Sequence, residues 1–218
     1  GNCTNLQIIQ LGYNYLTGPI PQQIFDLSSL IALFLNQNHL TGLLPQEVGN
    51  LKNLEELHVS NNKLFGEIPV ALGSCQVLEY LIMGNNLFEG TIPKSFEQLK
   101  GLQFLDVSHN NLSGQIPMFL GKFPFFQYVN LSYNMFQGEV PNGGVFTNIS
   151  AFSIAGNSKL CGGIEELQLP ACLVKDSKER KRSLNHRAIT VVVTLTIVLL
   201  LFFLLAFLCR MRRSRQQP

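Results

Sequence analysis

One spacing recurs through most of this sequence and limits what the chain can fold into. A leucine or phenylalanine returns every 24 residues, at Leu6, Leu30, Leu54, Leu78, Leu102 and Phe126. Apolar residues follow three and five positions later in each copy, and then an asparagine, a glycine and an aliphatic residue before proline. One such unit is too short to bury its own apolar face. Stability therefore has to come from stacking neighbouring units into a solenoid.

The unit has the form LxxLxLxxNxLxGxIPxxLxxLxx, which is the leucine-rich-repeat pattern. Its L-x-L segment predicts a short parallel strand, whose side chains point alternately into the core and away from it. Its proline lacks an N–H and ends any strand, so we expect an irregular or 3-10 convex side. The fold prediction is a leucine-rich-repeat solenoid of six repeats over residues 1–141, with parallel strands on the concave face.

An asparagine occupies the position at which each unit turns away from its strand. Its side-chain amide can bond backbone groups that no strand partner satisfies, and stacking predicts a continuous ladder. The members are Asn14, Asn38, Asn62, Asn86, Asn110 and Asn134.

Alternation along each strand predicts which side chains face outward on the concave surface. The candidates for partner binding are Phe34, His58, Tyr80, Ile82, Phe104, Asp106 and Tyr128. Three of them are aromatic and occur at the same position of successive units, and such an exposed stripe is typical of a partner site. The alternative is that tyrosine simply suits an exposed strand. Both interpretations stay open at this point.

The 24-residue register fails after Pro141, and the segment 142–172 is predicted to be a C-terminal cap over the apolar end of the solenoid. Cys3 and Cys75 lie three repeats apart in one column, too far apart to form a disulfide. Both are predicted to be buried thiols that replace leucine.

The C-terminal part carries an uncharged apolar run between basic clusters. Residues 188–209 would form a helix about 33 Å long, enough to span a bilayer. Up to Cys172 there are six Lys/Arg against twelve Asp/Glu, and from Leu173 onward ten against two. We predict a basic juxtamembrane linker at 173–187, a transmembrane helix at 188–209 and a basic cytoplasmic stub at 210–218. The basic charge indicates membrane flanks and no nucleic-acid surface.

The Leu-x-Gly-x-Ile-Pro segment, the cap and the apolar run together resemble plant leucine-rich-repeat receptor-like kinases. Immune receptors for microbial patterns look like the closest subfamily. The stretch from Gly156 to Gly163, followed by Leu169-Pro-Ala-Cys172, is similar to that family's C-terminal cap. The resemblance implies a disulfide between Cys161 and Cys172. The alternative, a metal pair, is disfavoured because no His or CxxC motif lies nearby.

Sequons for N-glycosylation begin at Asn2, Asn111, Asn130 and Asn148. Cys209, at the inner edge of the apolar run, is a candidate for palmitoylation, and the alternative is an ordinary apolar helix residue. No signal peptide precedes the repeats, so we expect the sequence to be a piece of a longer protein.

No catalytic constellation is found in the sequence: it has no Gly-rich phosphate loop, HRD loop or DFG, and no cofactor or metal site is predicted. The resemblance implies a receptor-kinase ectodomain with its single-pass anchor in the plasma membrane, N-terminal side outside, whose kinase domain would follow Pro218. Its expected partners are an extracellular peptide or protein ligand and a co-receptor with a leucine-rich-repeat ectodomain. The alternatives are a kinase-less receptor-like protein or a truncated receptor fragment, and a structural or inhibitor-type repeat protein.

Overall fold

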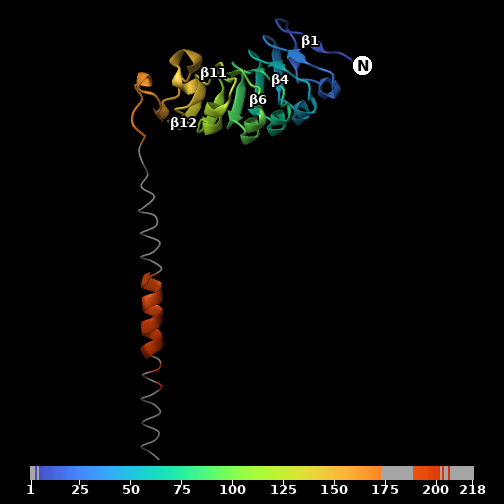
Figure 1. Ribbon diagram of the computed structural model, residues 1–218. Coiled ribbons are helices and arrows are strands. Elements are labelled where there is room, and N and C mark those ends of the chain that lie inside the picture. The colour runs from blue at the N-terminus through green and yellow to red at the C-terminus, as the bar shows by residue number, and fades with distance from the viewer. Residues whose placement is uncertain (1–2, 4, 173–188, 202, 204–205, 207–218) are drawn as a thin grey trace, which may run out of the picture. The chain divides into compact units, whose positions relative to one another are not determined.

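The computed structural model describes residues 3, 5–172, 189–201, 203 and 206, in two units that divide after Cys172. The first unit repeats short strands and 3-10 helices coil by coil, and successive coils lie side by side (Figure 1). The predicted solenoid with parallel strands is confirmed.

A parallel sheet runs along the first unit, with one strand from each coil. Neighbouring strands pair without slip, so that Leu33 is opposite Leu57 and Leu57 is opposite Leu81. In spatial order the strands in the described chain are β1 (Ile8–Gln10), β3 (Ala32–Phe34), β5 (Glu56–His58), β7 (Tyr80–Ile82), β9 (Phe104–Asp106), β11 (Tyr128–Asn130) and β13 (Phe152–Ser153).

A second parallel sheet follows the asparagine position of each coil, where the sequence predicted irregular backbone. Within the described residues it comprises β2 (Thr17–Gly18), β4 (His39–Gly42), β6 (Lys63–Glu67), β8 (Leu87–Gly90), β10 (Asn111–Gly114), β12 (Met135–Val140) and β14 (Lys159–Gly162). In this sheet, β2, β4, β6, β8 and β10 each end before the proline of their coil, because proline has no N–H to donate to a neighbouring strand. The prediction missed this sheet because most of its strands have a single buried apolar residue, as at Leu64 and Leu112, and one such residue per unit does not indicate a strand.

Each of these prolines immediately precedes a 3-10 helix, where its missing N–H and fixed φ cost nothing. The 3-10 helices of the described chain are η1 (Gln22–Asp26), η2 (Gln46–Asn50), η3 (Val70–Ser74), η4 (Lys94–Gln98), η5 (Met118–Lys122), η6 (Gly144–Thr147), η7 (Ile149–Ala151) and η8 (Glu165–Leu167). The expectation of 3-10 structure on this side is confirmed.

The core is continuous through the first unit because every coil contributes the same apolar positions. Leu57, Leu81 and Leu105, the central residues of three neighbouring strands, are fully buried. Phe96 of η4 and Phe136 of β12 belong to the same core and are also fully buried. Each coil is therefore stabilised mainly by its neighbours.

The segment predicted as a cap forms one more coil of the same solenoid. Its strand β13 continues the first sheet, with Phe152 opposite Val129, and β14 continues the second, with Leu160 opposite Gly138. Phe146 packs edge-on against Phe152, with ring centroids 5.3 Å apart. The cap thus covers the sixth repeat with matching backbone and apolar side chains.

The second unit is described only at residues 189–201, 203 and 206, which are helical. Among the residues that the structure describes, no helix is long and apolar enough to cross a membrane. The remaining residues of the predicted linker, span and stub, including Cys209, lie outside the described residues.

Candidate partner-binding surface

The seven candidate residues of the concave face all lie on the first sheet and point away from the core. Strands β5 and β7 bury their central residue and leave the two flanking side chains partly exposed, as at Tyr80, Leu81 and Ile82. The same pattern holds for β9 and β11. The parallel register places Tyr80 opposite Phe104 and Phe104 opposite Tyr128. The sheet therefore aligns the three aromatic residues across neighbouring coils.

Two aromatic contacts organise this surface. The rings of Tyr80 and Phe104 stack, with centroids 4.9 Å apart and planes 8° from parallel. The rings of Phe34 and His58 contact each other at 4.7 Å, tilted by 48°. Such pairs contribute about 0.5–1.5 kcal/mol beyond the area they bury, which helps to hold the rings in one orientation.

His58 lies beside Glu56 on β5. Its Nε2 atom is 3.2 Å from the Glu56 carboxylate, yet the orientation gives Nε2 no hydrogen bond within the described chain. Burial lowers the pKa of His58, and the nearby Glu56 carboxylate opposes that shift without cancelling it. The imidazole is therefore held toward its neutral form.

Polar side chains at the edge of the same sheet are ordered by hydrogen bonds. Gln127 donates to Gln103 and Gln103 donates to the Glu79 carboxylate, each over 2.8 Å. On β9, Oδ1 of Asp106 accepts from the backbone N–H of Ser108 over 2.9 Å. Both carboxylates are thereby held in fixed positions.

The asparagine ladder ties each coil to the one before it. Asn86, which is buried, donates to the carbonyl oxygens of Met83 and, in the preceding coil, Val59. Its Oδ1 accepts from the backbone N–H of Leu64 over 3.0 Å. The same contacts recur at Asn38, Asn62, Asn110 and Asn134. Asn14, at the exposed first coil, makes only local bonds.

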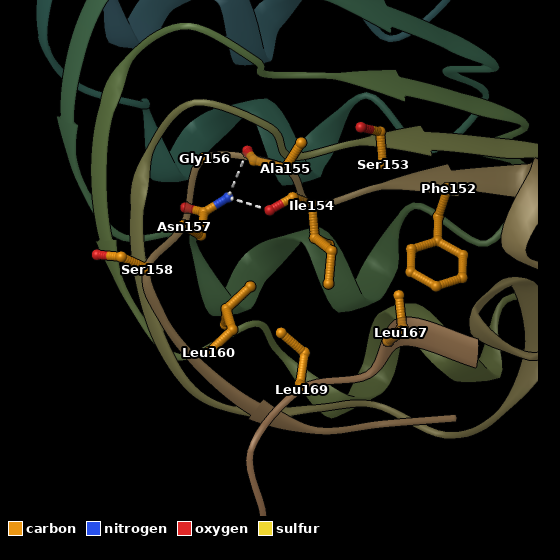
Figure 2. Close-up of a pocket in the computed structure, with 10 residues that line it drawn as sticks. All are labelled: Phe152, Ser153, Ile154, Ala155, Gly156, Asn157, Ser158, Leu160, Leu167 and Leu169. Carbon is orange, nitrogen blue, oxygen red and sulfur yellow. Dashed lines mark hydrogen bonds between the residues drawn. The ribbon is translucent and has the colours of Figure 1, made fainter. Parts of the chain in front are cut away.

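A seventh member of the ladder, Asn157, was missed by the sequence prediction. It donates to Leu131 and Ile154 and accepts from Phe136, as the other members do (Figure 2 shows its bond to Ile154). It lies 23 rather than 24 residues after Asn134, so a fixed period passes over it. The Asn-x-x-Leu sequence that it begins is the available signal.

The cysteines of the cap form a disulfide, as the family resemblance implied, with Cys161 and Cys172 sulfurs 2.11 Å apart. Cys161 lies on β14, and the bond holds the end of the described first unit against that strand. In the chain-entropy model a loop this short contributes on the order of 3 kcal/mol.

Cys75 is fully buried, as predicted, and its thiol donates to the carbonyl of Val48 over 3.3 Å. Burial raises its pKa to about 11. The matching prediction for Cys3 is wrong, because Cys3 is exposed. It lies at the outer edge of the first coil, whereas Cys75 lies between two coils.

An apolar hollow of about 600 Å³ lies at the cap end of the first unit. Figure 2 shows Ile154, Leu160, Leu167 and Leu169 directed toward one another there, with Phe152 beside them. These side chains come from the last coil, from η8 and from the segment just after η8, so the hollow belongs to the cap and lies away from β7 and β9.

The described sequons lie in three settings. Asn111 and Asn148 are exposed, on β10 and beside η7. Asn130 lies on the concave sheet, opposite Asp106, and its Oδ1 accepts from the Ser132 hydroxyl over 2.6 Å. Asn2 lies outside the described residues, and glycosylation at all four sites stays a prediction. No group of three or more His, Cys, Asp or Glu in the described chain could hold a metal ion.

Comparison with known proteins places this geometry in a family. Leucine-rich-repeat families match residues 2–64, 77–99 and 101–123. The chain is 31% identical to a chain of the BIR3–SERK2 complex from Arabidopsis thaliana, covering 75% of this chain and 72% of that one, with a TM-score of 0.55. The chain therefore belongs to the leucine-rich-repeat family. It is homologous to the ectodomains of plant leucine-rich-repeat receptor kinases.

Two further structures are similar over most of the first unit. The ectodomain of the Arabidopsis thaliana membrane receptor kinase GASSHO1/SCHENGEN3, in complex with CASPARIAN STRIP INTEGRITY FACTOR 2, is 38% identical, with a TM-score of 0.72 over 79% of this chain. The Arabidopsis receptor kinase HAESA, in complex with the peptide hormone IDA and the co-receptor SERK1, is 30% identical, with a TM-score of 0.64 over 73% of this chain. The matches cover 20% and 30% of those chains.

Two full-length Arabidopsis thaliana relatives match shorter segments. The LRR receptor-like serine/threonine-protein kinase EFR is 43% identical over 44 residues, 20% of this chain. The putative receptor-like protein kinase At3g47110 is 45% identical over 68 residues, 30% of this chain. The matches span only 4% and 6% of those proteins, so most of each relative has no counterpart in this chain.

Proposed function

We propose that this chain is the extracellular ligand- and co-receptor-binding portion, with the membrane anchor, of a plant leucine-rich-repeat receptor-like serine/threonine kinase. The observation that carries the proposal is the alignment of Tyr80, Phe104 and Tyr128 across three strands, partly exposed on the concave sheet. Large aromatic side chains on an open face are typical of binding hot spots. Homologous receptors complexed with a peptide hormone and a co-receptor support both kinds of partner.

The experiment replaces Tyr80, Phe104 and Tyr128 with alanine together. Peptides that bind the wild-type chain are first selected from a display library. The affinity of each variant is then measured for these peptides, and for the SERK1 ectodomain in the presence of the peptides. We expect affinity to fall by roughly 1–3 kcal/mol, about 5- to 150-fold.

The control replaces Phe65 and Leu87, which are also large and apolar and are more exposed than the three aromatic residues, but lie on the second sheet. That variant should bind as the wild type does, and circular dichroism should show both variants folded. Unchanged affinity in the triple variant would place the partner surface elsewhere on the molecule.

The anchor is proposed from the uncharged run at 188–209 and the basic cluster after it, which favour a single span with the N-terminal side outside. Expression behind a signal peptide should give a product whose mass falls when N-glycans are removed, and a C-terminal tag that antibodies cannot reach on intact cells. A tag accessible from outside would reverse the orientation.

The kinase assignment is carried by the relatives, whose names describe receptor kinases. The alternative is a kinase-less receptor-like protein or a truncated receptor fragment with the same ectodomain. Sequencing the transcript past Pro218 separates the two, because only a receptor kinase continues into a Gly-rich loop and an HRD loop. An immune or a developmental role would follow from the ligand that the selection identifies.

A further inference from the structure

The concave face of the described first unit carries negative charge and no Lys or Arg side chain. On the described strands of the first sheet (β1, β3, β5, β7, β9, β11 and β13) and the residues flanking each of them there is no Lys or Arg, whereas Glu55, Glu56, Glu79 and Asp106 all occur there. The lysines of the first unit lie elsewhere, on β6, β14, η4 and η5 or just after η2 and η4, at Lys52, Lys63, Lys94, Lys100, Lys122 and Lys159. A face charged in this way attracts a cationic partner and repels an acidic one.

Phe104 offers an aromatic face at the centre of this field. One side of its ring stacks on Tyr80. Tyr128 is its neighbour on the other side by backbone register, but in the described chain no ring contact joins Phe104 to Tyr128. The second side of the Phe104 ring is thus not covered by another aromatic ring. A planar cation could lie against it.

Asp106 supplies a carboxylate within reach of that ring. It is two residues further along β9 and on the same side of the sheet, about 6.6 Å away along the strand. Its Oδ1 is held by the N–H of Ser108, while Oδ2 accepts no hydrogen bond within the described chain. Glu79, by contrast, already accepts from Gln103.

We propose that Phe104 and Asp106 together bind an arginine side chain of a peptide or protein partner. The guanidinium is planar, so it can stack on the Phe104 ring while its N–H groups donate to the Asp106 carboxylate. A lysine ammonium is a compact charge that can pair with Asp106 but lacks the flat stacking surface. This inference rests on the proposed function and adds the chemistry of the ligand.

Neighbouring side chains limit how the arginine can approach. Ile82 and Asn130 lie opposite Asp106 on the two adjacent strands. Ile82 is apolar and partly buried, so it shields the ion pair from water on one side. Asn130 begins a sequon, and a glycan there would stand beside the same carboxylate.

The test uses the full 218-residue chain in a neutral detergent and three blocked pentapeptides, Ac-Gly-Ala-Xaa-Ala-Gly-amide, with arginine, lysine or citrulline at Xaa. Citrulline has the shape of arginine without its charge. Binding is measured by saturation-transfer NMR on the peptide, which detects weak complexes. We expect the arginine peptide to bind best, lysine less well and citrulline least.

Asp106→Asn should weaken binding of the arginine peptide about tenfold, as expected for the loss of one charge-assisted pair. Phe104→Ala should reduce the preference for arginine over lysine about threefold, because it removes the stacking surface. The matched control is Glu89→Gln, which removes an exposed carboxylate from β8 on the second sheet and should change nothing.

Equal binding of the arginine and citrulline peptides would overturn this inference, as would equal behaviour of Asp106→Asn and Glu89→Gln. If display-selected peptides still lose affinity for the triple aromatic variant, the proposed partner surface survives and only the arginine preference is wrong. If they do not, the proposed function itself fails at this surface. Unchanged circular dichroism of each variant ensures that the comparison concerns folded protein.

Discussion

Asn86→Ala tests whether the asparagine ladder stabilises the solenoid. The side chain is buried; it donates to the carbonyl oxygens of Met83 and Val59 and, over a longer 3.4 Å, of Gly84, and it accepts from the N–H of Leu64. Alanine removes all of these bonds at once while leaving the apolar core positions intact. The effect is therefore one of hydrogen bonding, with little contribution from lost apolar packing.

The partners of Asn86 lose unequal shares of their hydrogen bonding. The carbonyl of Met83 keeps a bond from Asn110, and that of Val59 keeps one from Asn62, so each loses only part of its hydrogen bonding. The buried N–H of Leu64 loses its acceptor, which costs about 1–3 kcal/mol. With the weakened carbonyl bonds added, we expect a loss of about 2–4 kcal/mol of unfolding free energy, a large share of a typical domain's stability.

Urea unfolding of the full chain, followed by far-ultraviolet circular dichroism, measures this change. The matched control is Asn14→Ala, because Asn14 is exposed and bonds only to Leu11 and Gly12, so we expect it to cost under about 1 kcal/mol. Asn86→Asp should be at least as harmful as alanine, because a carboxylate cannot donate to the carbonyls around it. Equal effects of Asn86→Ala and Asn14→Ala would refute the view that the ladder carries stability between coils.

Three further outcomes are expected. Gly66→Ala should lower the free energy of unfolding by about 1–2 kcal/mol, because the φ of Gly66 is +80°. The control Gly101→Ala should not destabilise the protein, because no atom of the described chain beyond its two neighbours lies closer than 3.8 Å to the added Cβ. The urea unfolding midpoints of the two variants measure the difference. At pH 8 iodoacetamide should label Cys3 far faster than Cys75, whose pKa is about 11, and equal rates by mass spectrometry would contradict its burial. Burial lowers the pKa of His58, so as the pH falls the unfolded chain protonates this imidazole at a higher pH than the folded chain does. The free energy of unfolding should therefore fall as the pH drops below about 6.5. His58→Gln should make that fall less steep.

The repeating part of the fold was predictable because its signal is periodic. The apolar columns fix which residues are buried, and the alternation of each strand then fixes that Tyr80 and Phe104 face outward together. The last coil was only partly predictable, since Asn157 is one residue out of step and Phe152 replaces the expected leucine pattern. A capping coil has a neighbour on one side only, so its sequence need not match the consensus.

The contacts within the candidate site could not be predicted from column positions. The sequence treats Tyr80, Phe104 and Tyr128 as equivalent, yet only the first two rings stack in the described chain. Side-chain rotamers and local twist decide such contacts, and neither leaves a pattern in the sequence. The hydrogen bond that orients Asp106 comes from the backbone of Ser108, so residue identity alone does not indicate it.

The ladder also determines how such a protein can change over evolutionary time. Each internal asparagine side chain forms the same set of hydrogen bonds to its own coil and to the preceding coil. Removal of residues 62–85 would therefore bring Asn86 into the place of Asn62 and preserve every type of bond. The same deletion would remove Tyr80 and with it the stack on Phe104. Unequal recombination between repeats would thus keep the scaffold while altering the surface, and new binding specificities could arise without passing through unfolded intermediates.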